Sequence, residues 1–178
     1  MNAANQFDLV VIGAGHAGCE AALAAARLGN KTLVITLNLD AVALMPCNPS
    51  IGGTGKSQLV REVDALGGQM ALVIDQATLQ SRTLNTGKGP AVHSLRAQAD
   101  KKVYQRLMKQ ALLAEENIEL RQGEVMDFLV RGGMIHGVRT VTGDSIACRA
   151  VVVASGVYLN SRVIIGDKDW AAGPQGLL

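Results

Sequence analysis

The sequence predicts an α/β fold built on a buried parallel sheet, and three observations in its first 40 residues support this. Residues 9–12 form an apolar, mostly β-branched run that is typical of a strand buried on both faces. A glycine-rich turn and an alanine-rich stretch of helical character follow, and Gly29 stands where this helix should end. Residues 31–36 then supply a second apolar run. The segment therefore reads as strand, turn, helix and strand.

The turn after the first strand has the spacing G-x-G-x-x-G, with Gly13, Gly15 and Gly18. The first glycine permits a sharp turn, the second lets a diphosphate approach the backbone, and the third lets helix and strand pack closely. Free N–H groups and the dipole at the helix N-terminus attract the phosphates. We therefore predict a dinucleotide site, rather than a purely structural turn, at Gly13, Ala14, Gly15, His16, Ala17 and Gly18.

The end of the second predicted strand favours FAD over NAD as the ligand. The acidic residue expected there for the ribose is replaced by Thr36 and Asn38. A hydroxyl or amide forms a weaker hydrogen bond than a carboxylate, so further contacts are needed. We expect one of them from Ser155 and Gly156, which follow a returning buried strand at residues 151–154.

The 178 residues, of which 48% are hydrophobic, suit one domain. We divide it into a first βαβ unit (7–40), a Cys/Gly-rich and basic loop region (41–96), and a helix, β-meander and returning strand (97–178). The predicted meander strands are residues 125–130, 135–141 and 145–148. The ending around Trp170 is expected to hold no closing strand, which leaves the fold incomplete at the C-terminus. No apolar run reaches about 18 residues and no secretory signal is recognisable, so a cytoplasmic protein without membrane contact is expected.

The segment "MPCNPSIGGTGKSQLVREVDALGG", residues 45–68, resembles the phosphate loop of nucleotide triphosphatases. That loop requires a glycine five positions before Gly55, where this chain has Ser50, and two prolines disfavour a preceding buried strand. We expect instead an irregular loop and then a helix at residues 54–66. Its buried stripe is predicted to be Leu59, Val63 and Leu66.

Three widely spaced cysteines, Cys19, Cys47 and Cys148, give neither a disulfide framework nor a zinc pattern, and no metal site is predicted. Cys47 is either a small apolar filler or a nucleophile. Backbone N–H donors of its loop and nearby Lys56 would stabilise a thiolate.

The basic residues are unevenly distributed. Residues 82–109 hold seven Lys and Arg against one acid, Asp100, while the remaining chain has ten basic and fourteen acidic residues. Such a positive segment attracts phosphate polyanions, although a solvated helix surface has the same composition. The candidate contacts are Lys56, Lys88, Arg96, Lys102 and Arg106, the last two on a helix expected at residues 97–115.

Three segments carry a family resemblance: "VIGAGHAGCEAALAAARLG", residues 45–68 as quoted, and "TLNTGKGPAVHSLRAQADKKVY". In this order they closely resemble the N-terminal part of the glucose-inhibited division protein A family, the FAD-dependent tRNA uridine 5-carboxymethylaminomethyl modification enzymes. The patterns C-N-P-x-I-G-G-x-G-K and K-G-P-A-V are far more specific than the glycine spacing. The resemblance implies a three-layer FAD-binding fold of the glutathione reductase type, with a further cofactor contact at Val125.

The resemblance also implies a reaction. Family members use reduced flavin, NADH and methylene-tetrahydrofolate to modify the wobble uridine of certain tRNAs, as homodimers within a heterotetramer with a GTPase partner. Cys47 matches a cysteine that the family uses in catalysis, and the second such cysteine lies beyond residue 178. The alternatives are an NAD(P)H-linked flavin oxidoreductase with a small-molecule substrate, or a non-catalytic fragment. A related folate-dependent tRNA methyltransferase shares the glycine turn but not the cysteine loop.

Overall fold

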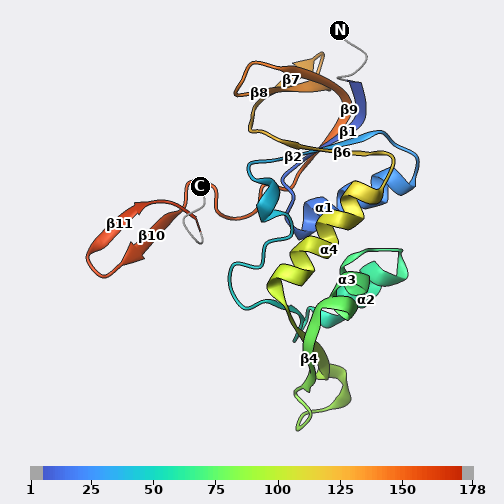
Figure 1. Ribbon diagram of the computed structural model, residues 1–178, viewed down its shortest axis with the longest axis vertical. Coiled ribbons are helices and arrows are strands. Elements are labelled where there is room, and N and C mark those ends of the chain that lie inside the picture. Colours follow the sequence, from blue (N-terminus) through green and yellow to red (C-terminus); the bar gives the residue numbers. More distant parts are fainter. Residues whose placement is uncertain (1–5, 174–178) are drawn as a thin grey trace.

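The computed structural model describes residues 6–173, whose framework is a six-stranded sheet in the order β6-β2-β1-β9-β8-β7 (Figure 1). Strand β1 pairs in parallel with both β2 and β9, and β6 extends the parallel part beyond β2. The antiparallel strands β7, β8 and β9 form the predicted meander. The strand bounds are β1 Gln6–Ile12, β2 Thr32–Thr36, β6 Ile118–Gln122, β7 Val125–Arg131, β8 Met134–Thr140 and β9 Ser145–Val153.

The parallel sheet lies between two hydrophobic cores, as the three-layer prediction requires. Val11 and Val34 face a core shared with helices α1 (His16–Arg27) and α4 (Lys101–Ala114). Val10 belongs to a second core, which includes Val138 and Ile146 of the meander. Successive strand residues point to opposite faces, so β1 contributes to both cores. The three-layer α/β fold is confirmed.

One strand performs two predicted roles. The third meander strand and the returning strand were predicted as separate segments, but β9 runs without a break from Ser145 to Val153. Its first part pairs with β8, and it continues beside β1, where Val10 lies opposite Val151. The meander is therefore rigidly continuous with the parallel sheet.

The region 41–96, predicted as a loop region with one helix at residues 54–66, contains that helix as α2 and also strands and a second helix that were not predicted. A second sheet has the order β3-β5-β4, and two helices precede β4. Strand β4 is polar and almost fully exposed, so it lacks the alternation of apolar residues that identifies a strand in sequence. The elements are η2 Leu39–Ala41, β3 Ser50–Gly52, α2 Ser57–Ala65, α3 Met70–Ala77, β4 Thr78–Leu84, η3 Pro90–Val92 and β5 Ser94–Ala99.

The predicted inward stripe of α2 is also wrong. Leu59 and Leu66 are 59% and 90% exposed, and Val63 is exposed too. The helix begins at Ser57, and Val60 is the residue that packs against the core. Helix α2 lies at the edge of the molecule beside α3, so an amphipathic pattern alone did not show which side is covered.

Helix α4 begins four residues later than predicted, because Ala97 belongs to β5. The Asp100 carboxylate accepts hydrogen bonds from the backbone N–H groups of Lys102 and Val103 at 2.9 and 3.0 Å. This is an N-cap, the position where aspartate is most favourable. Asp100 therefore separates the last strand of the small sheet from the helix.

The segment around Trp170, predicted to hold no closing strand, forms a separate two-stranded hairpin of β10 (Arg162–Ile165) and β11 (Lys168–Ala171). It projects from the end of β9, and most of its residues are exposed (Figure 1). Arg162 and Asp169 form an ion pair across it. Within residues 6–173, no helix is long and apolar enough to cross a membrane.

Two adjacent leucines of α4 test the position of the first core. Leu112 is fully buried, whereas Leu113 is 62% exposed. We expect Leu112→Ala to lower the free energy of unfolding by about 3 kcal/mol, because it leaves a cavity. Leu113→Ala should change it by less than about 0.5 kcal/mol. Urea denaturation followed by circular dichroism measures both values, and equal effects would contradict this description of the core.

Candidate functional site

The glycine turn is held by backbone contacts that exclude side chains at two positions. Gly13 has φ +101°, and its N–H donates to the Ile35 carbonyl at 2.8 Å. A Cβ at Gly13 would overlap the Ala154 carbonyl oxygen, and one at Gly18 would overlap the Gly13 carbonyl oxygen. These two glycines are therefore required by the fold itself.

Gly15 differs from them, because no heavy atom lies within 4 Å of the position its Cβ would take. It is the N-cap of α1 and has no side chain, so no side-chain cap satisfies the first N–H groups of the helix. The open space and the free donors form a cradle into which a phosphate group fits. The diphosphate-binding role predicted for Gly15 requires such open space, and it stays a prediction.

The structure gathers the other predicted cofactor residues at the ends of neighbouring strands. Ala154 donates its N–H to the Ile12 carbonyl at 2.8 Å, which places Ser155 and Gly156 beside the glycine turn. At the end of β2, the Thr36 carbonyl accepts from Gly123 at 2.9 Å, two residues before Val125. All lie at the carboxyl edge of the parallel strands, where dinucleotides bind in such folds.

His16, the first residue of α1, has a buried Nε2 atom without a hydrogen-bond partner. Its ring lies 5.6 Å from the ring of Tyr104 in α4. Burial lowers the pKa of His16, and the nearby Glu20 carboxylate opposes this effect only in part. The imidazole is therefore neutral at neutral pH.

Two more buried polar atoms without partners belong to α4, the Tyr104 hydroxyl and the Gln105 Oε1 atom. Burial also raises the pKa of Tyr104, with smaller contributions from Cys19 and Glu20, so the hydroxyl stays protonated. Buried polar groups are normally paired, so these atoms need a water or ligand partner. Neither residue was predicted as functional, since a sequence pattern shows that a tyrosine faces inward but not whether its hydroxyl is satisfied.

Helix α1 also fixes the position of α3. The Glu20 carboxylate accepts hydrogen bonds from the N–H groups of Gln69 and Met70, at 3.0 and 2.6 Å, and so caps α3. At the other end of α1, Arg27 donates to the Gly67 carbonyl at 2.6 Å. These contacts join the region 41–96 to the helix that carries the glycine turn.

Cys47 is the exposed member of the three cysteines and lies in the loop between η2 and β3. The other two thiols are buried: burial raises the pKa of Cys19 to about 12, and it also raises the pKa of Cys148. Cys19 donates weakly to the Ala14 carbonyl at 3.4 Å. Of the three, Cys47 alone presents its sulfur to a solute. The described residues contain no group of three potential metal ligands.

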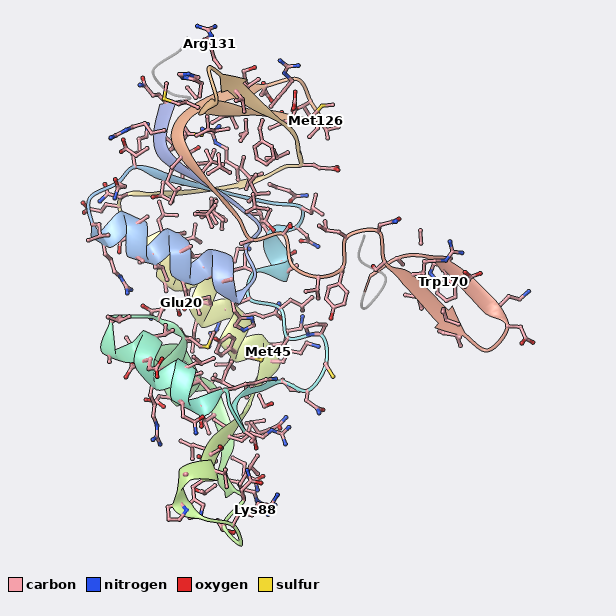
Figure 2. All side chains as sticks on the ribbon, turned by 180° about the vertical axis from the view of Figure 1, so that it is seen from behind. Glu20, Met45, Lys88, Met126, Arg131 and Trp170 are labelled. Atoms are coloured by element: carbon pink, nitrogen blue, oxygen red, sulfur yellow. The ribbon has the colours of Figure 1, made fainter. Side chains whose placement is uncertain are left out.

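The predicted tRNA-contact residues fall into two groups. Lys102 and Arg106 of α4 line a groove of about 410 Å³ together with Leu39 and Asp40. Lys56 precedes α2 and Arg96 lies in β5, while Lys88 occupies the tip of the molecule farthest from the meander (Figure 2). The basic segment is therefore not one continuous helix surface.

A parallel sheet with a tight glycine turn, an open helix N-terminus above it and a meander on the other face defines a dinucleotide-binding domain of the glutathione reductase type. The class of the protein follows from these features. More narrowly, the chain belongs to the glucose inhibited division protein A family, whose sequence model matches residues 8–178.

Individual relatives agree with this assignment. The chain is 59% identical over 173 residues to the "tRNA uridine 5-carboxymethylaminomethyl modification enzyme MnmG" of Heliobacterium modesticaldum. This alignment covers 97% of this chain and 27% of that protein. The structure of Aquifex aeolicus GidA superposes with a TM-score of 0.94 at 50% identity, over 99% of this chain and 29% of that one. A probable FAD-dependent monooxygenase of Pseudomonas aeruginosa, pqsL, shares the fold at 18% identity, with a TM-score of 0.63 over 86% of this chain and 43% of its own. The chain thus spans under a third of the first two proteins.

The neutral state of His16 predicts a pH dependence of stability. Its pKa in the folded chain lies below the ordinary value of 6.5, so the unfolded chain takes up a proton first as the pH falls. The free energy of unfolding should therefore decrease between about pH 7.5 and about pH 5.5. In His16→Gln this decrease should be smaller, whereas the exposed His136→Gln should behave like the parent chain. Thermal unfolding at several pH values measures the effect, and identical pH profiles for all three chains would contradict it.

Proposed function

We propose that this chain binds FAD in the glycine turn and forms the cofactor-binding part of an enzyme that modifies the wobble uridine of tRNA. The open cradle above Gly15 carries the cofactor assignment, because it offers unsatisfied N–H donors where a diphosphate fits. The RNA assignment is supported by similarity to a relative named as a tRNA uridine modification enzyme.

Different residues at the carboxyl edge of the sheet would bind different parts of the cofactor. The N–H groups at the start of α1, from His16 to Gly18, would bind the diphosphate, and the Thr36 hydroxyl would bind a ribose hydroxyl. The backbone at Val125 and at Ser155–Gly156 would contact the remainder. When bound, the flavin supplies the redox chemistry of the reaction.

Cys47 would act on the substrate as a nucleophile or as a proton carrier. Its exposed thiol lies in a loop that follows the end of β2, and the loop continues into the backbone of β3. A thiol that carries a proton or forms a covalent bond must be reachable by the reacting base. Exposure satisfies this requirement, which the buried Cys19 and Cys148 do not meet.

The complete reaction involves components that this chain does not account for. We propose tRNA as the substrate, NADH and methylene-tetrahydrofolate as co-substrates, and a GTPase as partner of a homodimer within a heterotetramer. Lys56, Lys88, Arg96, Lys102 and Arg106 are the proposed tRNA contacts. A visible spectrum of the purified chain with added FAD is the first test, since a chain that binds no flavin would act as a non-catalytic module.

Two glycine substitutions separate a structural role from a binding role. Gly18→Ala should disturb the turn, because the new methyl group overlaps the Gly13 carbonyl, and should lower both stability and FAD binding. Gly15→Ala has open space and a φ of −69°, so the chain should fold normally yet bind FAD at least about tenfold more weakly. Flavin fluorescence titration and thermal unfolding measure the two effects. If Gly15→Ala bound FAD with unchanged affinity, the assignment of the diphosphate to the glycine turn would be wrong.

The three cysteines allow a test of Cys47. In the native chain we expect a disulfide reagent to modify one thiol rapidly and all three only after unfolding. Cys47→Ser should abolish the rapid phase and, in the modifying enzyme, should eliminate wobble-uridine product while FAD remains bound. Product formation at the parent rate by Cys47→Ser would reject the catalytic assignment. Cys148→Ser serves as the control, because the Cys148 thiol is buried.

A further inference from the structure

The register of the small sheet places two arginines directly opposite each other. Arg82 of β4 pairs with Arg96 of β5, and Gly52 of β3 lies on the other side of Arg96. Directly opposed residues of antiparallel strands share one face of the sheet, with their Cβ atoms about 5 Å apart. The side chains of Arg82 and Arg96 therefore leave the backbone next to each other on the same face of the sheet.

This face points away from the hydrophobic core. The adjacent row of the sheet consists of Ile51, Ala97 and Ser81, and the first two pack into the core with α1 and α4. Because side chains alternate between faces along a strand, the row with Arg82 and Arg96 lies on the opposite side. Gly52, the β3 residue of this row, contributes no side chain to it.

Neither arginine has an acidic partner in the part of the chain that the structure describes. Within residues 6–173, none of the salt bridges involves Arg82 or Arg96. The next row on the same face holds the amides Gln80 and Gln98, opposite each other. Like charges directly opposed across strands destabilise a sheet, so this arrangement opposes folding unless an anion binds to it.

The chemistry of this face matches a phosphodiester group. Guanidinium groups present planar forks of N–H donors that bind phosphate oxygens in pairs, and amides add neutral donors beside them. Lys56 at the start of α2 and Lys88 just before η3 add positive charge on segments next to the small sheet. The amide and guanidinium donors together extend over more than one row of the sheet, which suits a polymer backbone better than one small anion.

We propose that Arg82 and Arg96 jointly bind a phosphodiester of an RNA backbone on the open face of the β3-β5-β4 sheet, with Gln80 and Gln98 as adjacent hydrogen-bond donors. This inference rests on the proposed tRNA substrate and adds Arg82 and the two glutamines to its contacts. The diphosphate of the cofactor is a second source of the same chemistry. The glycine turn already provides for it at the N-terminus of α1, whereas β4 lies at the far end of the molecule beyond α2 and α3 (Figure 1).

The substitution Arg82→Glu separates binding from folding. It removes one phosphate ligand and places a carboxylate opposite Arg96, so the sheet gains an ion pair while the site loses its charge. We expect at least about tenfold weaker binding of labelled tRNA at low salt, and a slope of log K against log salt that is smaller by about one. The melting temperature should be unchanged or higher by about 1–2 °C.

The matched control is Arg131→Glu, at the tip of the meander and at the opposite end of the molecule from Lys88 (Figure 2). It changes the net charge by the same amount and should alter tRNA affinity by less than about twofold. FAD affinity, measured by flavin fluorescence, should be the same in both variants and the parent chain.

Each outcome decides a different question. If Arg82→Glu binds tRNA like the parent chain, the site is refuted while the proposed function stands. If it loses FAD affinity and keeps tRNA affinity, the pair belongs to the cofactor and the inference is also refuted. If the parent chain binds no tRNA even at low salt, both the RNA assignment and this site fail.

Discussion

The close contact between the glycine turn and the end of β9 is the constraint on which the rest of the molecule depends. Gly13 and Gly18 approach the backbone of Ala154 and of each other so closely that no side chain fits. This contact fixes the direction in which α1 leaves the sheet, and hence where its free N–H groups point. The same strand, β9, forms the meander that covers the opposite face. The contact between the glycine turn and β9 therefore determines the position of both the cofactor cradle and the second core.

Helix α1 transmits that constraint to the rest of the chain. At the N-terminus of α1, the ring of His16 lies beside the ring of Tyr104 in α4. Farther along α1, Glu20 caps α3, and Arg27 donates a hydrogen bond to the turn before α3. The region 41–96 is thus joined to α1 by polar contacts in addition to its apolar residues in the first core, such as Val73 and Ile74. The exposed leucines of α2 are consistent with this, because that helix is attached through neighbours rather than buried.

The sequence predicted the elements whose apolar residues follow a clear period. The strands β1 and β2 and the meander were recognisable because buried strands are rich in apolar and β-branched residues. Strand β4 was missed because it is polar and exposed. Strand β5 alternates Leu95, Ala97 and Ala99 with polar residues, but its end was assigned to the start of the following helix. The hairpin at Trp170 was not predicted because its strands are only four residues long, and β10 does not alternate apolar with polar residues.

The candidate site divides in a similar way. The glycine turn and its neighbours at Thr36 and Ser155 followed from local spacing and from the rule that parallel strands end at one edge. By contrast, the unsatisfied Tyr104 hydroxyl and the opposition of Arg82 to Arg96 depend on register and packing between distant segments. No local pattern contains such information. Asp100 links these two features, because it ends β5 and caps α4, and its N–H donates to the Ala77 carbonyl at 2.7 Å. Asp100 is the only residue between β5 and α4, so the sheet that carries the two arginines is joined directly to the helix that carries Tyr104. Rotating one element relative to the other would require breaking the Asp100 cap.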